Sequence, residues 1–167
     1  MDIIQTSFLC GGSTDNFLAM PNVQAHTIGD QMDSASKNAI SILEALAQIN
    51  QQFIQFFLAQ RVMSYVVASK HEFECREYIT KYEVQIYIDL ELSNGSAISW
   101  ILQLSWVDEN WILEASIKLN SDATQETIVY IPELKIATLN LCIARLKEYA
   151  QLLLDKKAHE LINDLFN

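Results

Sequence analysis

The sequence has few basic residues. Among its 167 residues, 11 are Lys or Arg and 21 are Asp or Glu, which gives a formal net charge of −10 at pH 7. Apart from the adjacent Lys156 and Lys157, no cluster of cationic residues occurs along the chain. Binding to nucleic acid or to an anionic membrane surface needs clustered Lys and Arg side chains. We therefore expect neither nucleic acid nor a membrane among the partners of this protein.

Cysteine is also scarce, and the positions of the three cysteines do not suggest disulfides. Cys10, Cys75 and Cys142 lie far apart, and their number is odd. The first residues contain Asp2 but none of the Lys or Arg that begin a typical secretory signal. These features predict free thiols and a cytoplasmic location.

The chain contains only four glycines and two prolines, and most of them lie near its start. Residues 1–33 hold three of the glycines, one proline and four Asp, with no Lys or Arg. This composition predicts an acidic N-terminal arm that is partly disordered or docked. Residues 34–167 are numerous and apolar enough to form a single α+β domain with its own core.

A long uncharged stretch dominates the first half of the chain, because no Asp, Glu, Lys or Arg occurs between Glu44 and Arg61. Apolar residues recur there at intervals of three and four, which predicts a helix over residues 34–69. Its interspersed amides exclude a membrane span. The helix has two apolar stripes, where packing by one face needs one. The first stripe contains Ala39, Ile42, Leu46, Ile49, Phe53, Phe56, Gln60, Met63 and Val67, and the second contains Ile40, Leu43, Ala47, Ile54, Leu58 and Tyr65.

From Tyr82 onward the apolar period changes to two, which is the period of half-buried strands. The alternation predicts strands over residues 82–92, 96–107, 111–119 and 126–131. Pro132 is expected to end the last strand and to begin a second long helix over residues 133–166, with a weak point near residues 155–157. The predicted fold is therefore a long N-terminal helix, a four-stranded antiparallel meander and a long C-terminal helix. After an even number of antiparallel strands the chain returns to the end of the sheet where it entered, so the two helices should run antiparallel. Both should cover the same face of the sheet, because only one face is apolar.

The turns can be predicted from the requirement that paired residues point to the same face of the sheet. A three-residue loop over residues 93–95 places Leu90 opposite Ile98, with Gly95 in the left-handed region. At the next turn, Trp106 opposite Trp111 leaves either residues 108–109 or residues 107–110 in the loop.

The predicted helices are longer than the predicted strands, at roughly 50 Å against roughly 27–37 Å. Both helices should extend past the same end of the sheet and expose apolar side chains there, which monomers rarely do. A second copy of the chain is the favoured cover, and the arm or another protein is the alternative. The residues predicted to form this self-association or partner surface are Ile42, Leu46, Ile49, Phe53 and Phe56.

The outward face of the predicted sheet is acidic, and a basic or amphipathic partner would complement it. The simpler interpretation is that this face is exposed to solvent and that its charges keep the protein soluble. The residues assigned to this acidic partner face are Glu83, Tyr87, Asp89, Glu91 and Glu114.

Three tryptophans, Trp100, Trp106 and Trp111, point inward on adjacent predicted strands. They are candidates for an apolar pocket between sheet and helices, which would make the chain a small-ligand-binding protein. An ordinary packed core is the alternative.

The segment from His71 to Cys75 is the densest group of possible metal ligands, but no second cluster supplies the three or four ligands that a metal site needs. No catalytic motif or phosphate-binding glycine loop occurs. We therefore predict a protein without cofactor or enzymatic activity. The pattern favours a protein-interaction module, adaptor-like or chaperone-like, that forms a homodimer through its first helix.

Overall fold

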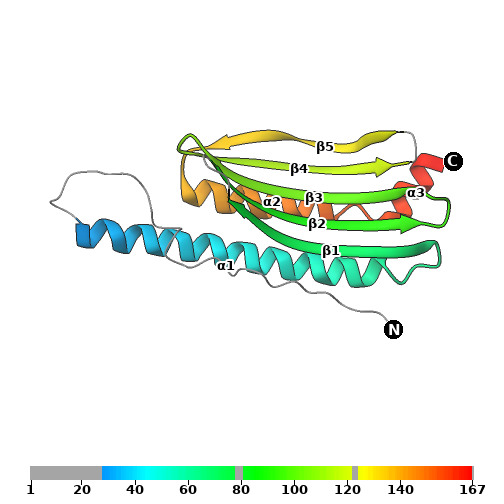
Figure 1. The fold of residues 1–167 in the computed structure, drawn as a ribbon, viewed down its shortest axis with the longest axis horizontal. Coiled ribbons are helices and arrows are strands. Elements are labelled where there is room, and N and C mark those ends of the chain that lie inside the picture. Colours follow the sequence, from blue (N-terminus) through cyan, green and yellow to red (C-terminus); the bar gives the residue numbers. More distant parts are fainter. Residues whose placement is uncertain (1–27, 78–80, 122–123, 167) are drawn as a thin grey trace.

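The computed structural model describes residues 28–77, 81–121 and 124–166, and it forms an α+β fold with one antiparallel sheet (Figure 1). The strands follow one another in the order β1-β2-β3-β4-β5. This class and the meander are as predicted, although the sheet has one strand more than predicted. The elements are α1 (Ile28–Gln60), β1 (Val66–Glu77), β2 (Lys81–Leu92), β3 (Ala97–Val107), β4 (Asn110–Asn120), β5 (Gln125–Ile136), α2 (Leu139–Leu154) and α3 (Ala158–Phe166).

The first helix begins and ends earlier than predicted. It starts at Ile28, so the last six residues of the predicted arm, residues 28–33, are helical. The prediction for residues 1–27 lies outside the described residues. The helix ends at Gln60, and β1 begins within the predicted helix and continues into the segment before the first predicted strand. β1 lacks a clear alternation because charged residues stand on an edge strand with little buried surface, so only its pairing with β2 identifies it.

The fifth strand reverses the predicted direction of the second helix. With an odd number of strands the chain leaves the sheet at the end opposite to its entry, so α1 and α2 run parallel rather than antiparallel (Figure 1). Contacts between the C-terminal ends of both helices agree with this direction. The Ala158 amide donates to Gln60 Oε1 at 3.1 Å, and Lys157 Nζ lies 5.1 Å from the centre of the Phe56 ring.

The C-terminal region also differs from the prediction. β5 continues through Pro132 to Ile136, because an edge strand can lose a donor and still pair on its inner side. The second helix is divided into α2 and α3 at the predicted weak point near residues 155–157. Since α2 is only 16 residues long, only α1 extends past the end of the sheet (Figure 1).

Both predicted turns are confirmed. Leu90 pairs with Ile98, and Gly95 has a φ of 84°, a conformation that glycine adopts without strain. Trp106 pairs with Trp111 and Val107 pairs with Asn110, so the second turn contains Asp108 and Glu109 only.

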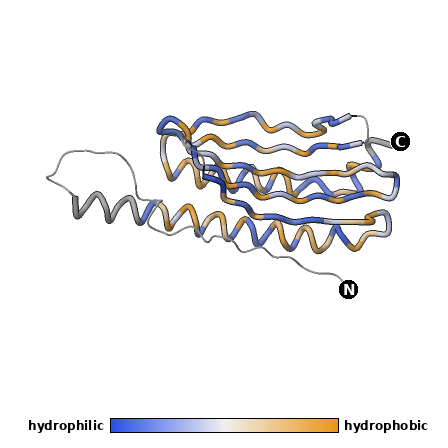
Figure 2. Tube along the Cα trace, viewed as in Figure 1, coloured by the Kyte–Doolittle hydropathy of each residue, from blue (hydrophilic) through white to orange (hydrophobic). Residues whose placement is uncertain are grey.

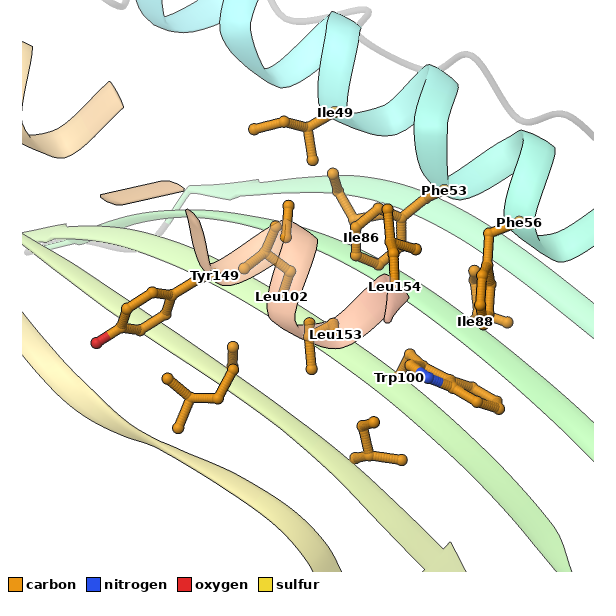
Figure 3. Packing of buried hydrophobic residues seen from close by; sticks show 14 of the residues in the cluster. Ile49, Phe53, Phe56, Ile86, Ile88, Trp100, Leu102, Tyr149, Leu153 and Leu154 are labelled. Carbon is orange, nitrogen blue, oxygen red and sulfur yellow. The ribbon is translucent and has the colours of Figure 1, made fainter. Parts of the chain in front are cut away.

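The core lies between the inner face of the sheet and the helices α1 and α2. Apolar and polar residues alternate along the strands, as the period of two requires (Figure 2). The largest fully buried side chains come from α1 and from β2 to β5, and α2 adds Leu146, Tyr149 and Leu153 (Figure 3). The central members are Ile49, Phe53, Ile86, Ile88, Leu90, Ile98, Trp100, Leu102, Leu104, Leu113, Ile117 and Ile136.

Candidate protein-interaction site

The structure separates the two apolar stripes of α1. From Ile42 to Gln60 the first stripe faces the sheet and α2, where its apolar residues fill the core (Figure 3). Its last two members, Met63 and Val67, lie beyond the end of α1. The prediction that this stripe forms a self-association surface is therefore wrong, because no partner can reach it while the domain is folded. The five residues concerned, Ile42, Leu46, Ile49, Phe53 and Phe56, are at most 7% exposed.

The second stripe of α1 points outward. Ile40, Leu43 and Leu58 are 54%, 46% and 38% exposed, Ala47 is exposed, and Ile54 is half-buried. At 100° per residue these five positions fall within a sector of about 60°, and we call this sector the α1 flank. It carries no charged side chain.

The α1 flank adjoins β1 rather than α2. Two residues next to the flank on the helix surface, Asn50 and Phe57, contact His71 of β1. Asn50 Oδ1 lies 3.0 Å from His71 Nε2, and the Phe57 and His71 rings are 5.9 Å apart. Figure 1 shows α1 running along the β1 side of the sheet. The flank therefore lies beside the outer edge of β1.

The two edges of the sheet differ in regularity. From residue 68 to residue 77, β1 pairs with β2 without a register shift. β5 contains Pro132 and two register shifts, at which residues 132–133 and Ile128 bulge from the ladder with β4. Bulges and proline obstruct the addition of a further strand. Of the two edges in the described sheet, the β1 edge is thus the regular one.

The residues assigned to the acidic partner face share the outward face of the sheet with basic residues. The ladders place its acidic residues on the outward face, where β1 adds Lys70 and Arg76 beside them. Glu83 is buried between cations, with Lys81 Nζ at 2.6 Å and Arg76 Nη1 at 3.7 Å. Glu91 is exposed. The prediction missed the basic residues of this face because it missed β1.

Tyr87 and Asp89, also assigned to the acidic face, belong to a hydrogen-bond network centred on Ser99. The Ser99 hydroxyl donates to Asp89 Oδ1 at 2.6 Å, and it receives the Asn120 amide at 3.0 Å. The Tyr87 hydroxyl lies 3.3 Å from Ser99 Oγ. Burial raises the pKa of Tyr87. Each of these polar groups therefore has a hydrogen-bond partner within the network, which fits a structural role within the sheet.

Glu114 lies beside a concavity on the same outward face. Burial raises the pKa of its carboxyl, and a hydrogen bond with Glu133 raises it further. Glu133 reaches it because the bulge of β5 stands opposite Glu114 in the ladder. The concavity has a volume of about 320 Å³. It is lined by Gln85, Ile101, Gln103, Glu114, Ala115, Ser116, Lys118, Thr127 and Tyr130.

The tryptophans do not form one pocket. Trp100 is fully buried, its indole N–H donates to the Lys156 carbonyl at 3.1 Å, and the Phe56 ring packs edge-on at 5.4 Å (Figure 3). The rings of Trp106 and Trp111 pack on each other, with their centres 4.7 Å apart. They lie six residues along β3 from Trp100, a separation of roughly 20 Å. The concavity beside Glu114 has no tryptophan in its lining.

The residues from His71 to Cys75 do not converge on a metal site. His71 points inward to Asn50, while Glu72 and Glu74 pair with Lys70 and Arg76 on the outward face. Burial lowers the pKa of His71. Within the described part of the chain, no group of three or more His, Cys, Asp or Glu is placed to hold a metal ion.

None of the described helices combines the length and the apolar character that crossing a membrane requires. Compared with protein-family models, with curated proteins and with solved structures, the chain has no significant match.

Proposed function

We propose that this chain is a non-enzymatic protein-interaction module, adaptor-like or chaperone-like, that works as a homodimer through the α1 flank. The observation that supports this most directly is the exposure of the flank. Its apolar side chains lie in one sector of the helix, and between Glu44 and Gln60 the polar residues of the helix are amides rather than charges. Such contiguous apolar surface is typical of an interface.

A second copy suits this surface better than a charged partner. The flank has neither sign of charge, so it offers no electrostatic complement to a basic or acidic protein. It is also repeated along the helix at intervals of three and four, the spacing by which two helices pack side by side. A two-fold axis would bring identical flanks together.

The outward face of the sheet stays accessible in such a dimer, and we assign it to the partner protein. One row of side chains crosses all five strands there and contains three carboxylates and two amides. The row is formed by Glu74, Gln85, Gln103, Glu114 and Glu133. A basic or amphipathic segment would complement it. The three cysteines and the balance of charge fit work in the cytoplasm.

The test is the molar mass of the full chain in solution, measured by size exclusion with light scattering over a range of concentrations. We expect the wild type to be a dimer and the double variant Leu43→Glu, Leu58→Glu to be a monomer, because the new carboxylates would be buried in the interface. The matched control is Gln48→Glu, Gln55→Glu, which adds the same charge at exposed positions outside the flank. A wild type that remains monomeric at all concentrations would refute self-association.

A further inference from the structure

The contrast between the two sheet edges points to a specific use of β1. Natural proteins obstruct free edges with proline, bulges, short strands or charged side chains, since a regular edge pairs with other strands. Here β5 carries proline and bulges, whereas β1 over residues 68–77 carries charged side chains of both signs on a regular ladder. Within the described residues no strand pairs with the outer edge of β1.

The open edge and the α1 flank lie on the same side of the molecule. If a two-fold axis perpendicular to the sheet passes just outside the free edge of β1, the β1 strands of two copies lie antiparallel, about 4.8 Å apart. The helices beneath them then face each other with their flanks, and packed helices lie about 8–10 Å apart. One operation therefore covers both the outer edge of β1 around residues 68–74 and the exposed apolar stripe.

The charges of β1 select a register for this pairing. With His71 on the axis, Lys70 of each copy stands opposite Glu72 of the other, giving two attractive pairs on the outward face. With Phe73 on the axis, Lys70 meets Arg76 and Glu72 meets Glu74, so all four pairs repel. With Glu72 on the axis, Lys70 meets Glu74 twice, but the Glu72 carboxylates of the two copies stand opposite each other. With Cys75 on the axis, Glu74 meets Arg76 twice, but only residues 73–77 of β1 can pair. The His71 register has two attractive charge pairs, no repulsive one, and pairs residues 68–74. Opposite charges that face each other on neighbouring strands stabilise a sheet, and like charges destabilise it.

We propose that two copies of the chain join edge to edge through β1, with His71 on the two-fold axis, to form one continuous ten-stranded antiparallel sheet. This inference rests on the proposed homodimer and gives its geometry. Lys70 and Glu72 already form an exposed ion pair of 2.8 Å within one chain, and in the dimer each gains a second opposite charge across the axis. The His71 pair at the centre is neutral at pH 7, since burial lowers the pKa of the imidazole.

The test uses two charge reversals in the full chain, Lys70→Glu and Glu72→Lys. Either variant alone places like charges opposite each other twice across the axis, and we expect its dimer dissociation constant to rise about tenfold or more. When the two variants are mixed, every cross-axis pair becomes attractive. The mixture should therefore form heterodimers at the concentrations at which the wild-type protein dimerises. Native mass spectrometry of differently tagged chains would measure the fraction of heterodimer.

The matched controls are Lys135→Glu and Glu126→Lys, which make the same reversals at exposed positions of β5. We expect both to dimerise like the wild type. Circular dichroism of each variant establishes that it is folded before its mass is compared.

The outcomes separate this inference from the proposed function. If the wild type is a dimer that the α1 variants dissociate, but the β1 reversals leave it intact, then edge pairing is wrong and the homodimer stands. The same holds if the reversals weaken the dimer but mixing does not restore it, because the register is then wrong. A monomeric wild type overturns both, and the flank is then covered by residues 1–27 or by another protein.

Discussion

Gln60 joins distant parts of the chain through a single buried amide. It interrupts the apolar stripe of α1, yet it is buried, and its Oε1 accepts the Ala158 amide at the start of α3. From the sequence alone this glutamine is either a buried polar residue or a residue beyond the edge of the sheet. The structure decides for the first, since the parallel course of α1 and α2 brings the C-terminal end of α1 to the first residue of α3.

We predict that Gln60→Leu lowers the free energy of unfolding by about 1–3 kcal/mol, because it leaves the buried Ala158 N–H without its acceptor. Urea unfolding of both proteins measures the difference. The same substitution at the exposed Gln55 should change stability by less than about 0.5 kcal/mol. Equal effects at both positions would mean that the hydrogen bond contributes nothing.

Glu114 makes stability depend on pH. Its pKa is raised in the folded protein by burial and by Glu133, so the folded state holds this proton more tightly than the unfolded state. Stability therefore falls as the pH rises from the ordinary value of 4.5 through the folded pKa. We predict that Glu114→Gln gains stability relative to the wild type at pH 7 and not at pH 4.

Urea unfolding at both pH values measures this effect, with Glu91→Gln as a control at an exposed position of the same face. A gain of the same size at both pH values would show that titration of Glu114 is not its cause.

At the scale of the elements, the hairpin between β3 and β4 holds two residues in a conformation that suits glycine better. Asp108 and Glu109 have φ angles of 48° and 63°. A two-residue hairpin loop with both angles positive is the geometry that favours glycine at its second position. The requirement that Trp106 and Trp111 face the same side of the sheet predicted a short loop, but it did not decide between a loop of two residues and a loop of four.

We predict that Glu109→Gly raises the free energy of unfolding by about 0.5–1 kcal/mol, because glycine adopts the left-handed region without steric cost. The melting temperature should rise accordingly. Glu126→Gly, in the extended strand β5, should lower it, since glycine is unfavourable inside a strand. A drop in the melting temperature of the Glu109 variant would contradict this account of the turn.

At the scale of the whole molecule, one additional strand changes the arrangement of the surface. With β1 in place the sheet has an odd number of strands, so the helices run parallel and only α1 extends past the sheet. The outward charges of β1 also neutralise part of a face that otherwise looks acidic. The exposed apolar side chains of α1 therefore lie along its flank and not where two overhanging helices would meet.

We predict that deletion of residues 1–27 leaves the molar mass and the dimer dissociation constant unchanged, because in the proposed homodimer a second copy rather than the arm covers the flank. Light scattering of the truncated and full chains makes the comparison. A truncated chain that dimerises while the full chain stays monomeric would identify the arm as the cover.

Local patterns in the sequence were sufficient for the α+β class, for strands β2 to β4 and for the register of their turns. Alternation with a period of two is a property of each strand alone, and the requirement that Trp106 and Trp111 share a face then leaves few turns. The long helix of the first half also followed from its own period, although its end at Gln60 did not.

Tertiary structure decided the rest, because these features depend on what lies beside each element. β1 is a strand through its ladder with β2, and Pro132 is tolerated in β5 because that strand is at an edge. Both stripes of α1 are apolar, and only the position of the sheet buries the stripe with Phe53 and exposes the stripe with Leu58. The sequence thus determined that α1 has more apolar surface than a core needs, and the packing of the sheet determined which side of the helix remains exposed.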